Sequence, residues 1–296
     1  MRYFFPSPLA ERGLGGDVVS GLTPRLTRPR VRGGETKPVV LTIAGFDPSG
    51  GAGIIADIRT IESLGCIAVA AITSMTFQNA EKFFGANHQS AKSVREQVEA
   101  ITSAATIAGL KIGMLPTTEV AREVARLIRE HKLPLPVVDP VMESTSGGTL
   151  MENEAFEVLV TELLPLTRLG TPNIPEAERL AGINIHDEDD MRQAAARIRE
   201  LGVQAVLIKG GHLIQEAEGR RQEPGRNKRD AVDLLDDDGQ VTVFRSEWID
   251  APNVRGTGCM LSSAIAAGLA TGLALEEAVA QGKSLIADRI RRSIGD

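Results

Sequence analysis

The sequence predicts an α/β protein in which a central, mostly parallel sheet is covered by helices on both faces, giving three layers. Two observations predict this class. From Val39 onward, short β-type runs alternate with amphipathic helical segments, and each run ends where glycine or polar residues begin. Such alternation is typical of βαβ units, whose helices cover both faces of a parallel sheet. The chain has 296 residues, 42% hydrophobic and 24% charged, which suits one large α/β core.

In the first half of the core, the sequence predicts four strands and four helices. The strands are short apolar runs, and the helices carry apolar residues at spacings of three and four, as Ile54, Ile58 and Ile61 do in the first of them. The expected strands are 39–44, 66–74, 110–112 and 136–139. The remaining helices are expected at 90–106, 117–131 and 152–164.

The second half predicts the rest of the sheet and two closing helices. Helices are expected near 176–180 and 187–201, and the apolar run 205–208 has the composition of a buried strand. A charged insertion broken by glycine and proline, 215–230, is predicted to be a surface loop. Short strands at 232–235 and 241–244 then lead into helices at 258–271 and 275–292.

Residues 1–36 differ from the rest of the chain. They hold six arginines against three acids, no lysine, and many glycines and prolines. This composition predicts a disordered extension, because it offers little apolar surface to bury. It has no apolar core of a secretory signal, and it contains Glu11 and Asp17, which fit a transit peptide poorly. We therefore expect one domain at 37–296 in a cytoplasmic protein.

Composition argues against several function classes. The net charge of −6 disfavours binding to nucleic acid or to an anionic membrane, because both depend on Lys and Arg. No run of 18 uncharged apolar residues could span a bilayer. Cys66 and Cys259 match no zinc or redox spacing, and the four histidines are scattered. We expect neither a nucleic acid nor a membrane as a partner.

The glycine-rich segment 45–53 joins the first strand to the first helix, at the sheet edge where α/β proteins bind ligands. Its glycines let backbone approach a ligand closely and leave amides free at a helix N-terminus. Gly51, Gly53 and Ala56 also fit a dinucleotide-binding pattern, but the next strand ends without the acid which that pattern requires. A P-loop at Gly282-Lys283-Ser284 is rejected because position 277 is Glu rather than Gly.

Asp57 lies close to the apolar stripe of the first helix. A carboxylate so near a buried face needs a partner, although a solvated residue at the edge of the stripe explains it equally well.

Acids stand at the ends of two later segments. Asp139 ends the strand expected at 136–139, and Glu176 stands at a helix start in the segment 171–176. Hard oxygen ligands at strand ends are what a Mg²⁺–phosphate site uses. Glu176 alone is explained equally well by the helix dipole.

Two further segments offer a cation and amides at the same edge. Lys209 closes the strand 205–208 and could contact a phosphate, while His212 is expected to be a hydrogen-bonded loop residue rather than a metal ligand. Gly256-Thr257-Gly258-Cys259 precedes an apolar helix, so its amides could hold an anion. The helix dipole should lower the pKa of Cys259, unless Cys259 is a buried structural thiol, which its spacing alone favours.

Seven ordered segments resemble the hydroxymethylpyrimidine/phosphomethylpyrimidine kinases of thiamine biosynthesis, within the ribokinase-like superfamily. The resemblance runs from about Val39 to the C-terminus. The segments are TIAGFDPSGGAGIIAD (42–57), TFQN (76–79), KIGML (111–115), DPVM (139–142), TPNIPEAERL (171–180), KGGHL (209–213) and GTGCMLSSAIAAGLA (256–270).

The resemblance implies a ribokinase-like α/β/α kinase that uses ATP and Mg²⁺ to phosphorylate 4-amino-5-hydroxymethyl-2-methylpyrimidine and then its monophosphate. It implies a homodimer whose partners are small molecules. By the same resemblance the pyrimidine pocket consists of Gly45, Asp57, Gln78 and Met114. Asp139 and Glu176 serve the metal, Asn173 and Lys209 the nucleotide, and Gly256, Thr257, Gly258 and Cys259 the anion hole, with Cys259 at the position of the presumed base.

Two residues depart from the family pattern. Arg255 stands where the family usually has His, and is expected to keep a cation beside the phosphates. Phe46 stands where Ser or Thr is usual and could reshape the pyrimidine pocket.

Two other functions compete with this one. A pyridoxal or pyridoxine kinase shares the fold, but Gln78 favours a pyrimidine because its amide can both accept from an exocyclic amine and donate to a ring nitrogen. A pyrimidine-sensing module without catalysis is disfavoured because Asp139, Glu176, Lys209 and Cys259 are all present.

Overall fold

The computed structural model describes residues 36–79, 81–143, 148–211, 230–247, 249 and 255–295. The predicted extension, apart from Thr36, lies outside the described residues. The predicted insertion 215–230, apart from Asp230, and the loop residue His212 lie outside them too.

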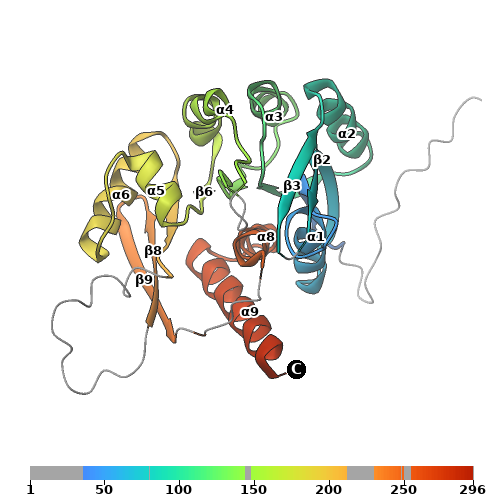
Figure 1. The fold of residues 1–296 in the computed structure, drawn as a ribbon. Coiled ribbons are helices and arrows are strands. Elements are labelled where there is room, and N and C mark those ends of the chain that lie inside the picture. Colours follow the sequence, from blue (N-terminus) through green and yellow to red (C-terminus); the bar gives the residue numbers. More distant parts are fainter. Residues whose placement is uncertain are drawn as a thin grey trace, which may run out of the picture.

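The described residues form a nine-stranded sheet in the order β3-β2-β1-β4-β5-β6-β7-β8-β9 (Figure 1). Strands β2, β1, β4, β5, β6 and β7 are mutually parallel, whereas β3 at one edge and β8 and β9 at the other pair antiparallel. The predicted mostly parallel α/β sheet is confirmed. The strands are β1 Val39–Phe46, β2 Ile67–Gln78, β3 Phe83–His88, β4 Ile107–Ile112, β5 Val137–Val138, β6 Leu169–Gly170, β7 Ala205–Lys209, β8 Asp230–Asp237 and β9 Gln240–Glu247.

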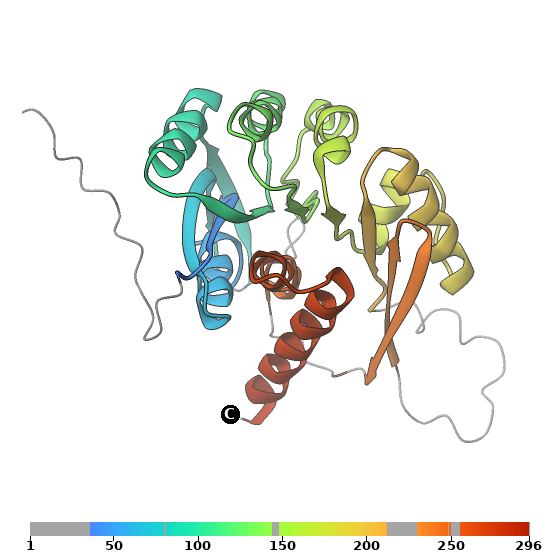
Figure 2. The ribbon, with the colours of Figure 1, turned by 180° about the vertical axis from the view of Figure 1, so that it is seen from behind.

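Helices cover both faces of the sheet (Figures 1 and 2). One layer holds α2 to α6, and the other holds α1, α8 and α9. The helices are α1 Gly53–Ser63, α2 Ala91–Ala104, α3 Thr118–Glu130, α4 Asn153–Val158, α5 Ile174–Ala181, α6 Glu188–Glu200, α8 Thr257–Ala270 and α9 Leu275–Gly295. No helix among the described residues is long and apolar enough to cross a membrane.

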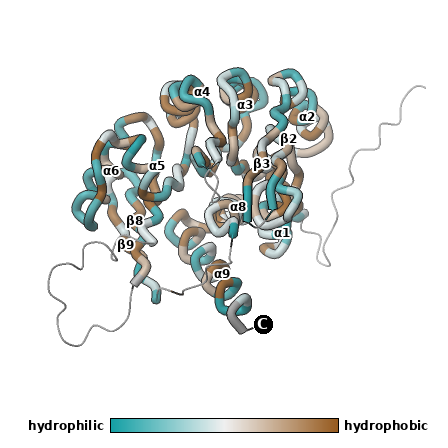
Figure 3. Tube along the Cα trace, viewed as in Figure 1, coloured by the Kyte–Doolittle hydropathy of each residue, from teal (hydrophilic) through white to brown (hydrophobic). Residues whose placement is uncertain are grey.

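Each face of the sheet has its own hydrophobic core. Because side chains alternate along a strand, Leu41 and Ile43 of β1 join the core under α2 to α6, whereas Val40 joins the core under α1, α8 and α9. The outer helices α3, α6 and α9 show hydrophilic and hydrophobic stretches side by side in Figure 3, as amphipathic helices do. Helix α8 is different, since most of its residues are buried.

Three local features differ from the sequence-based expectation. Strand β3 was not expected, because Gly85, Asn87 and His88 have low β propensity and the strand is held by pairing with β2. The two-residue strand β6 is too short to show a periodicity. The helix expected at 152–164 remains α-helical only to Val158, and continues as a π-helical turn and then a 3₁₀ turn that contains Pro165, which has no N–H to donate.

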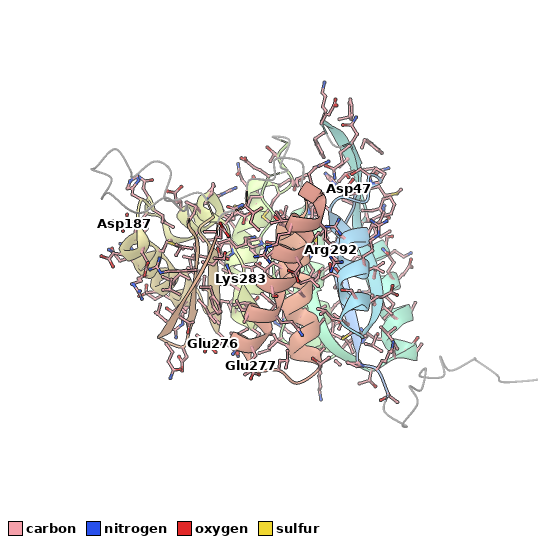
Figure 4. All side chains as sticks on the ribbon, turned by 90° about the horizontal axis from the view of Figure 1, so that it is seen from below. Asp47, Asp187, Glu276, Glu277, Lys283 and Arg292 are labelled. Carbon is pink, nitrogen blue, oxygen red and sulfur yellow. The ribbon has the colours of Figure 1, made fainter. Side chains whose placement is uncertain are left out.

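The parallel strands all end at one edge of the sheet. Figure 4 shows this edge at the end marked by Asp47, which follows β1, while Glu276 and Glu277 at the start of α9 mark the opposite end. The segments singled out from the sequence therefore converge on the Asp47 end.

Candidate active site

The predicted site residues lie at this carboxyl edge or in the helical turn that follows a strand there, with the exception of Asp57. Gly45 lies within β1, Gln78 ends β2 and Lys209 ends β7. Met114 and Asp139 follow β4 and β5, Asn173 and Glu176 begin α5, and Gly256 to Cys259 begin α8.

Gly45 and Met114 are in close contact. A Cβ at Gly45 would lie 2.9 Å from Met114 Sδ, so a larger residue at position 45 would displace the methionine side chain. The Thr73 hydroxyl in β2 donates to the Met114 carbonyl at 2.6 Å. Strands β1, β2 and β4 are thereby tied together at the predicted pyrimidine pocket.

The loop after β1 is shaped by Asp47, which the sequence analysis did not single out. Its Oδ1 accepts from the amide and hydroxyl of Ser49, and its Oδ2 accepts from the Ala52 amide at 3.0 Å. An acid two residues before a serine in a glycine-rich turn is a signal for such an Asx turn. Asp47 thus fixes the entry into α1.

This loop packs directly on the loop that begins α8. Gly256 has φ of 72°, and a Cβ there would lie 2.0 Å from the Gly51 carbonyl oxygen. Gly53 has φ of 58°, and a Cβ there would meet the Gly45 carbonyl oxygen at 2.2 Å. Both positions therefore require glycine on conformational and steric grounds.

Asp57 is fully buried, so the alternative of a solvated residue is wrong. Its Oδ2 accepts from the Thr42 hydroxyl at 2.7 Å and from Lys111 Nζ at 2.8 Å, and its Oδ1 accepts from the Ser263 hydroxyl at 2.8 Å. Lys111 is also 0% exposed. Thr42 and Lys111 are cross-strand neighbours in β1 and β4, and Ser263 comes from α8. The carboxylate is thus engaged by protein on both oxygens.

Lys111, the buried partner of Asp57, is a residue that the sequence-based reasoning did not identify. Burial disfavours the charged form of Lys111, but the neighbouring Asp57 carboxylate outweighs it and the net pKa of the lysine is raised. Lys111 is therefore a cation at neutral pH. The available signal was Lys111 itself, a cation inside an otherwise apolar strand.

The expectation for the thiol of Cys259 is wrong in sign. Burial raises its pKa to about 11, although the Lys111 cation and the Gly53 amide act to lower it. Desolvation thus outweighs the lowering effects of the Lys111 cation and the Gly53 amide. At neutral pH the thiol is protonated.

Lys209 and Asp139 form an ion pair against the first turn of α8. Lys209 Nζ lies 2.8 Å from Asp139 Oδ1, which also accepts from the Thr171 hydroxyl at 3.3 Å. A Cβ at Gly258 would lie 3.2 Å from Lys209 Nζ and 3.4 Å from Asp139 Oδ2. Burial acts to lower the pKa of Lys209, but Asp139 and Glu176 raise it overall, so the cation persists at neutral pH.

Asn173 and Glu176 form a capping box on α5. Asn173 Oδ1 accepts from the Glu176 amide at 2.9 Å, and Glu176 Oε2 accepts from the Asn173 amide at 2.8 Å. Burial raises the pKa of Glu176 to about 7, partly opposed by Lys209. Helix capping accounts for these contacts, and the raised pKa marks a carboxylate that would gain from a nearby cation.

Asp139 and Glu176 could hold a magnesium ion only together with ligands that the protein does not supply. No group of three or more His, Cys, Asp or Glu among the described residues could hold a metal. Mg²⁺ is commonly held by one or two carboxylates together with phosphates and waters. Asp139 and Glu176 therefore fit an ion that is bound jointly with a nucleotide, and not a cage made by protein alone.

Gln78 and Arg255 meet across the site. Arg255 Nη2 donates to Gln78 Oε1 at 3.2 Å, and Nη1 donates to the Asn79 carbonyl. The guanidinium therefore hydrogen-bonds to the end of β2. The sequence had predicted that it lies beside the phosphates.

A family model, phosphomethylpyrimidine kinase, matches residues 47–295. The chain belongs to this family. The chain is 41% identical over 252 residues to the thiamine biosynthesis bifunctional protein ThiED of Geobacter sulfurreducens, covering 85% of this chain and 49% of that protein. It is 38% identical to the hydroxymethylpyrimidine/phosphomethylpyrimidine kinase of Streptomyces coelicolor, covering 86% and 89%.

Solved structures share the fold. The phosphomethylpyrimidine kinase of Clostridium difficile is 38% identical, with a TM-score of 0.72, over 86% of this chain and 100% of that chain. The pyridoxal kinase of Bacillus subtilis, in an ADP complex, is 34% identical, with a TM-score of 0.72, over 84% and 90%. This member of the phosphomethylpyrimidine kinase family therefore has the ribokinase-like fold and is a phosphotransferase.

Proposed function

We propose that this chain catalyses two successive ATP-dependent phosphorylations in thiamine biosynthesis. The first converts 4-amino-5-hydroxymethyl-2-methylpyrimidine to its monophosphate, and the second converts the monophosphate to the diphosphate. The observation that carries the proposal is the contact of the Asp139–Lys209 pair with Gly258 at the start of α8, at the same sheet edge as Gly45, Met114 and Gln78.

The pyrimidine binds against Gly45, Met114 and Gln78. Gly45 and Met114 give an apolar wall for the ring, and the Gln78 amide offers polar atoms to a heterocycle. Asp57 does not contact the pyrimidine directly, because both of its oxygens already accept hydrogen bonds from Thr42, Lys111 and Ser263. Its part is to hold Lys111 and β4 in place.

The phosphates bind at the start of α8. This helix has no side-chain cap, so the amides of Thr257, Gly258 and Cys259 are available to an anion. Lys209 adds a fixed cation beside Gly258, with Asn173 on the neighbouring strand end. Phosphoryl transfer depends mainly on such positioned donors, which stabilise the charge that develops on the transferred group.

Asp139 and Glu176 would hold Mg²⁺ together with the nucleotide. The ion supplies charge neutralisation at the phosphates when it is bound. Glu176, whose pKa is raised to about 7 by burial, then keeps its carboxylate ionised more readily.

The thiolate form of Cys259, a minor fraction at neutral pH because the pKa of the thiol is about 11, acts as the proton acceptor of the first step. An alcohol must lose its proton as it attacks, whereas the phosphate nucleophile of the second step is already ionised. The second step therefore depends less on a base than the first step does.

Vitamin B6 phosphorylation is the second candidate function, because a pyridoxal kinase shares the fold at a similar identity. Gln78 favours the pyrimidine, since an amide can pair with both an exocyclic amine and a ring nitrogen.

We also propose a cytoplasmic homodimer in which residues 37–296 form a single kinase domain. Exposed apolar side chains on the β2–β3 hairpin, Met75, Phe77 and Phe84, support a protein partner for that edge. Light scattering on the purified chain should give twice the chain mass of 31.6 kDa.

The substitution Gln78→Leu tests the proposed pocket. Leaving polar groups of the pyrimidine unpaired should lower kcat/KM for the pyrimidine roughly tenfold to a hundredfold, with KM for ATP unchanged. Steady-state kinetics with each substrate varied in turn measures both. An unchanged kcat/KM would remove Gln78 from the pocket and favour the vitamin B6 alternative.

A further inference from the structure

Arg255 joins two parts of the site that the chain supplies 177 residues apart. It directly precedes Gly256, at the start of the loop that leads into α8. Its guanidinium reaches back to the end of β2, where Nη2 donates to Gln78 Oε1 at 3.2 Å and Nη1 donates to the Asn79 carbonyl. Two adjacent residues of the β2–β3 hairpin are therefore held by one side chain.

The pairing of β2 with β3 is irregular near this contact, so the end of β2 has fewer regular ladder hydrogen bonds. The β2–β3 pairing is irregular between Phe77 and Gln78, which places Gln78 beside a bulge. Asn79 makes the turn that follows, with its Oδ1 accepting from the amides of Glu81 and Lys82. Arg255 anchors this turn from outside the hairpin.

The guanidinium of Arg255 has hydrogen-bond donors and no acceptor, so the oxygen of the Gln78 amide must face it. The atom next to Arg255 must be the acceptor Oε1, and the Nε2 group is turned the other way. Among the described residues, no side chain or carbonyl accepts a hydrogen bond from Gln78 Nε2. Toward the described residues the amide therefore keeps two free donors on Nε2, and Oε1 keeps a second lone pair that can accept from an exocyclic amine.

We propose that Arg255 is a positioning residue that sets the orientation of the Gln78 amide, so that the site presents an N–H donor to an acceptor on the substrate ring. The inference rests on the proposed function, in which Gln78 binds the pyrimidine. With this orientation the site selects a substrate with an unprotonated ring nitrogen. A ring nitrogen that carries hydrogen would place its own N–H against the N–H groups of Gln78. Arg255 then acts on substrate affinity rather than on the phosphates.

The test is a double-substitution cycle on the full chain, with the pyrimidine alcohol and ATP each varied. Arg255→Met keeps the aliphatic stem and removes the donors. It should raise KM for the pyrimidine about tenfold, with kcat and KM for ATP changed less than about twofold. In the Gln78→Leu background the same substitution should change the pyrimidine KM less than about twofold, because its target is gone.

Two variants serve as controls. Arg255→Lys restores one donor but not the fork, and should recover part of the affinity. Arg122→Met removes a guanidinium of α3 that pairs with Glu162 on the outer surface, and should leave all three kinetic constants unchanged. Thermal melts of every variant show whether folding is preserved, and Arg255→Lys carries the test if Arg255→Met does not fold.

The outcomes separate the two ideas. If Gln78→Leu raises the pyrimidine KM but Arg255→Met does not, the positioning role is overturned and the proposed function stands. If Arg255→Met raises the pyrimidine KM by the same factor in both backgrounds, or acts instead on KM for ATP, the positioning role is also overturned. If the unaltered chain does not phosphorylate the pyrimidine, the proposed function fails and this inference fails with it.

Discussion

The thiol of Cys259 shows how burial can reverse a simple expectation from a helix dipole. The positive end of α8 acts to lower its pKa, yet desolvation raises it to about 11. Because this value lies well above neutral pH, the thiolate fraction grows about tenfold for each pH unit between roughly 7 and 10. A base with this property makes the first phosphorylation faster at alkaline pH.

Cys259→Ala tests this role. The first phosphorylation should slow by about a hundredfold or more, because a general base is removed, while the second should slow less. In the unaltered chain, the logarithm of the first-step rate should rise with pH, and the variant should lose that dependence. Single-turnover rates for each step from about pH 6.5 to 9.5 measure both effects. Rates near those of the unaltered chain, with a lower Tm, would show instead that Cys259 is a packing residue.

The Asp57–Lys111 pair is expected to matter for stability as much as for the site. Lys111→Met leaves a buried carboxylate with only two hydroxyl partners, which should cost about 3–5 kcal/mol. That corresponds to a Tm lower by at least about 6 °C for a core of this size. The double variant Asp57→Leu/Lys111→Met should regain much of the loss, because no unpaired charge remains.

The matched control is Lys92→Met, which removes a lysine from an exposed pair with Glu96 on α2. Thermal and urea unfolding of all four proteins gives the comparison. A Tm equal to that of the unaltered chain for Lys111→Met would mean that the buried pair contributes nothing to stability.

The predicted site residues lie mostly at the sheet edge where the sequence placed them, but the sequence did not predict the hydrogen bonds between them. Asp139 and Lys209 could be placed because each stands where an expected strand ends, and parallel strands end at one edge, whereas Glu176 was placed by its position at a helix start. The partner of Asp57 could not, since Lys111 lies 54 residues away and only the register of β4 beside β1 brings it near. The hydrogen bond of Arg255 to Gln78 was hidden for the same reason.

The junction between the two glycine-rich loops is the element on which the site depends. Gly256→Ala would place a Cβ in the left-handed region and 2.0 Å from the Gly51 carbonyl oxygen. The two loops must then separate, which should abolish most turnover in both steps. Calorimetry measures ATP binding by the variant, and steady-state assays measure its turnover.

Gly65→Ala is its control, because Gly65 has φ of 83° but nothing lies within 4 Å of the position that a Cβ would take there. It carries the backbone strain without the clash, so it should cost about 1 kcal/mol and leave turnover unchanged. Equal activity in the two variants would contradict the close packing of the loops.

Elements with a strong apolar period were predictable to within a few residues. Helices α1, α2, α3, α6, α8 and α9 were expected near their observed bounds, because each presents an apolar stripe or an apolar run to the sheet. Strand β3 was not predicted, because what stabilises it is pairing to β2 rather than its own composition.

In the molecule as a whole, two hydrophobic cores lie on the two faces of the sheet, and the candidate site lies at its carboxyl edge. Alternation along β1 divides its side chains between the cores, and the same alternation turns Thr42 toward Asp57. The fold class followed from this pattern. The edge strand β3 required pairing information that the periodicity of a single chain does not contain.

The most direct test of the central claim is the product sequence of the reaction. The full chain is incubated with ATP, Mg²⁺ and 4-amino-5-hydroxymethyl-2-methylpyrimidine, and products are followed by mass spectrometry, with pyridoxal in a parallel reaction. We expect the monophosphate to appear first and then to be converted to the diphosphate, with two ADP formed for each pyrimidine consumed. Phosphorylation of pyridoxal without phosphorylation of the pyrimidine, or accumulation of the monophosphate as the final product, would contradict this expectation.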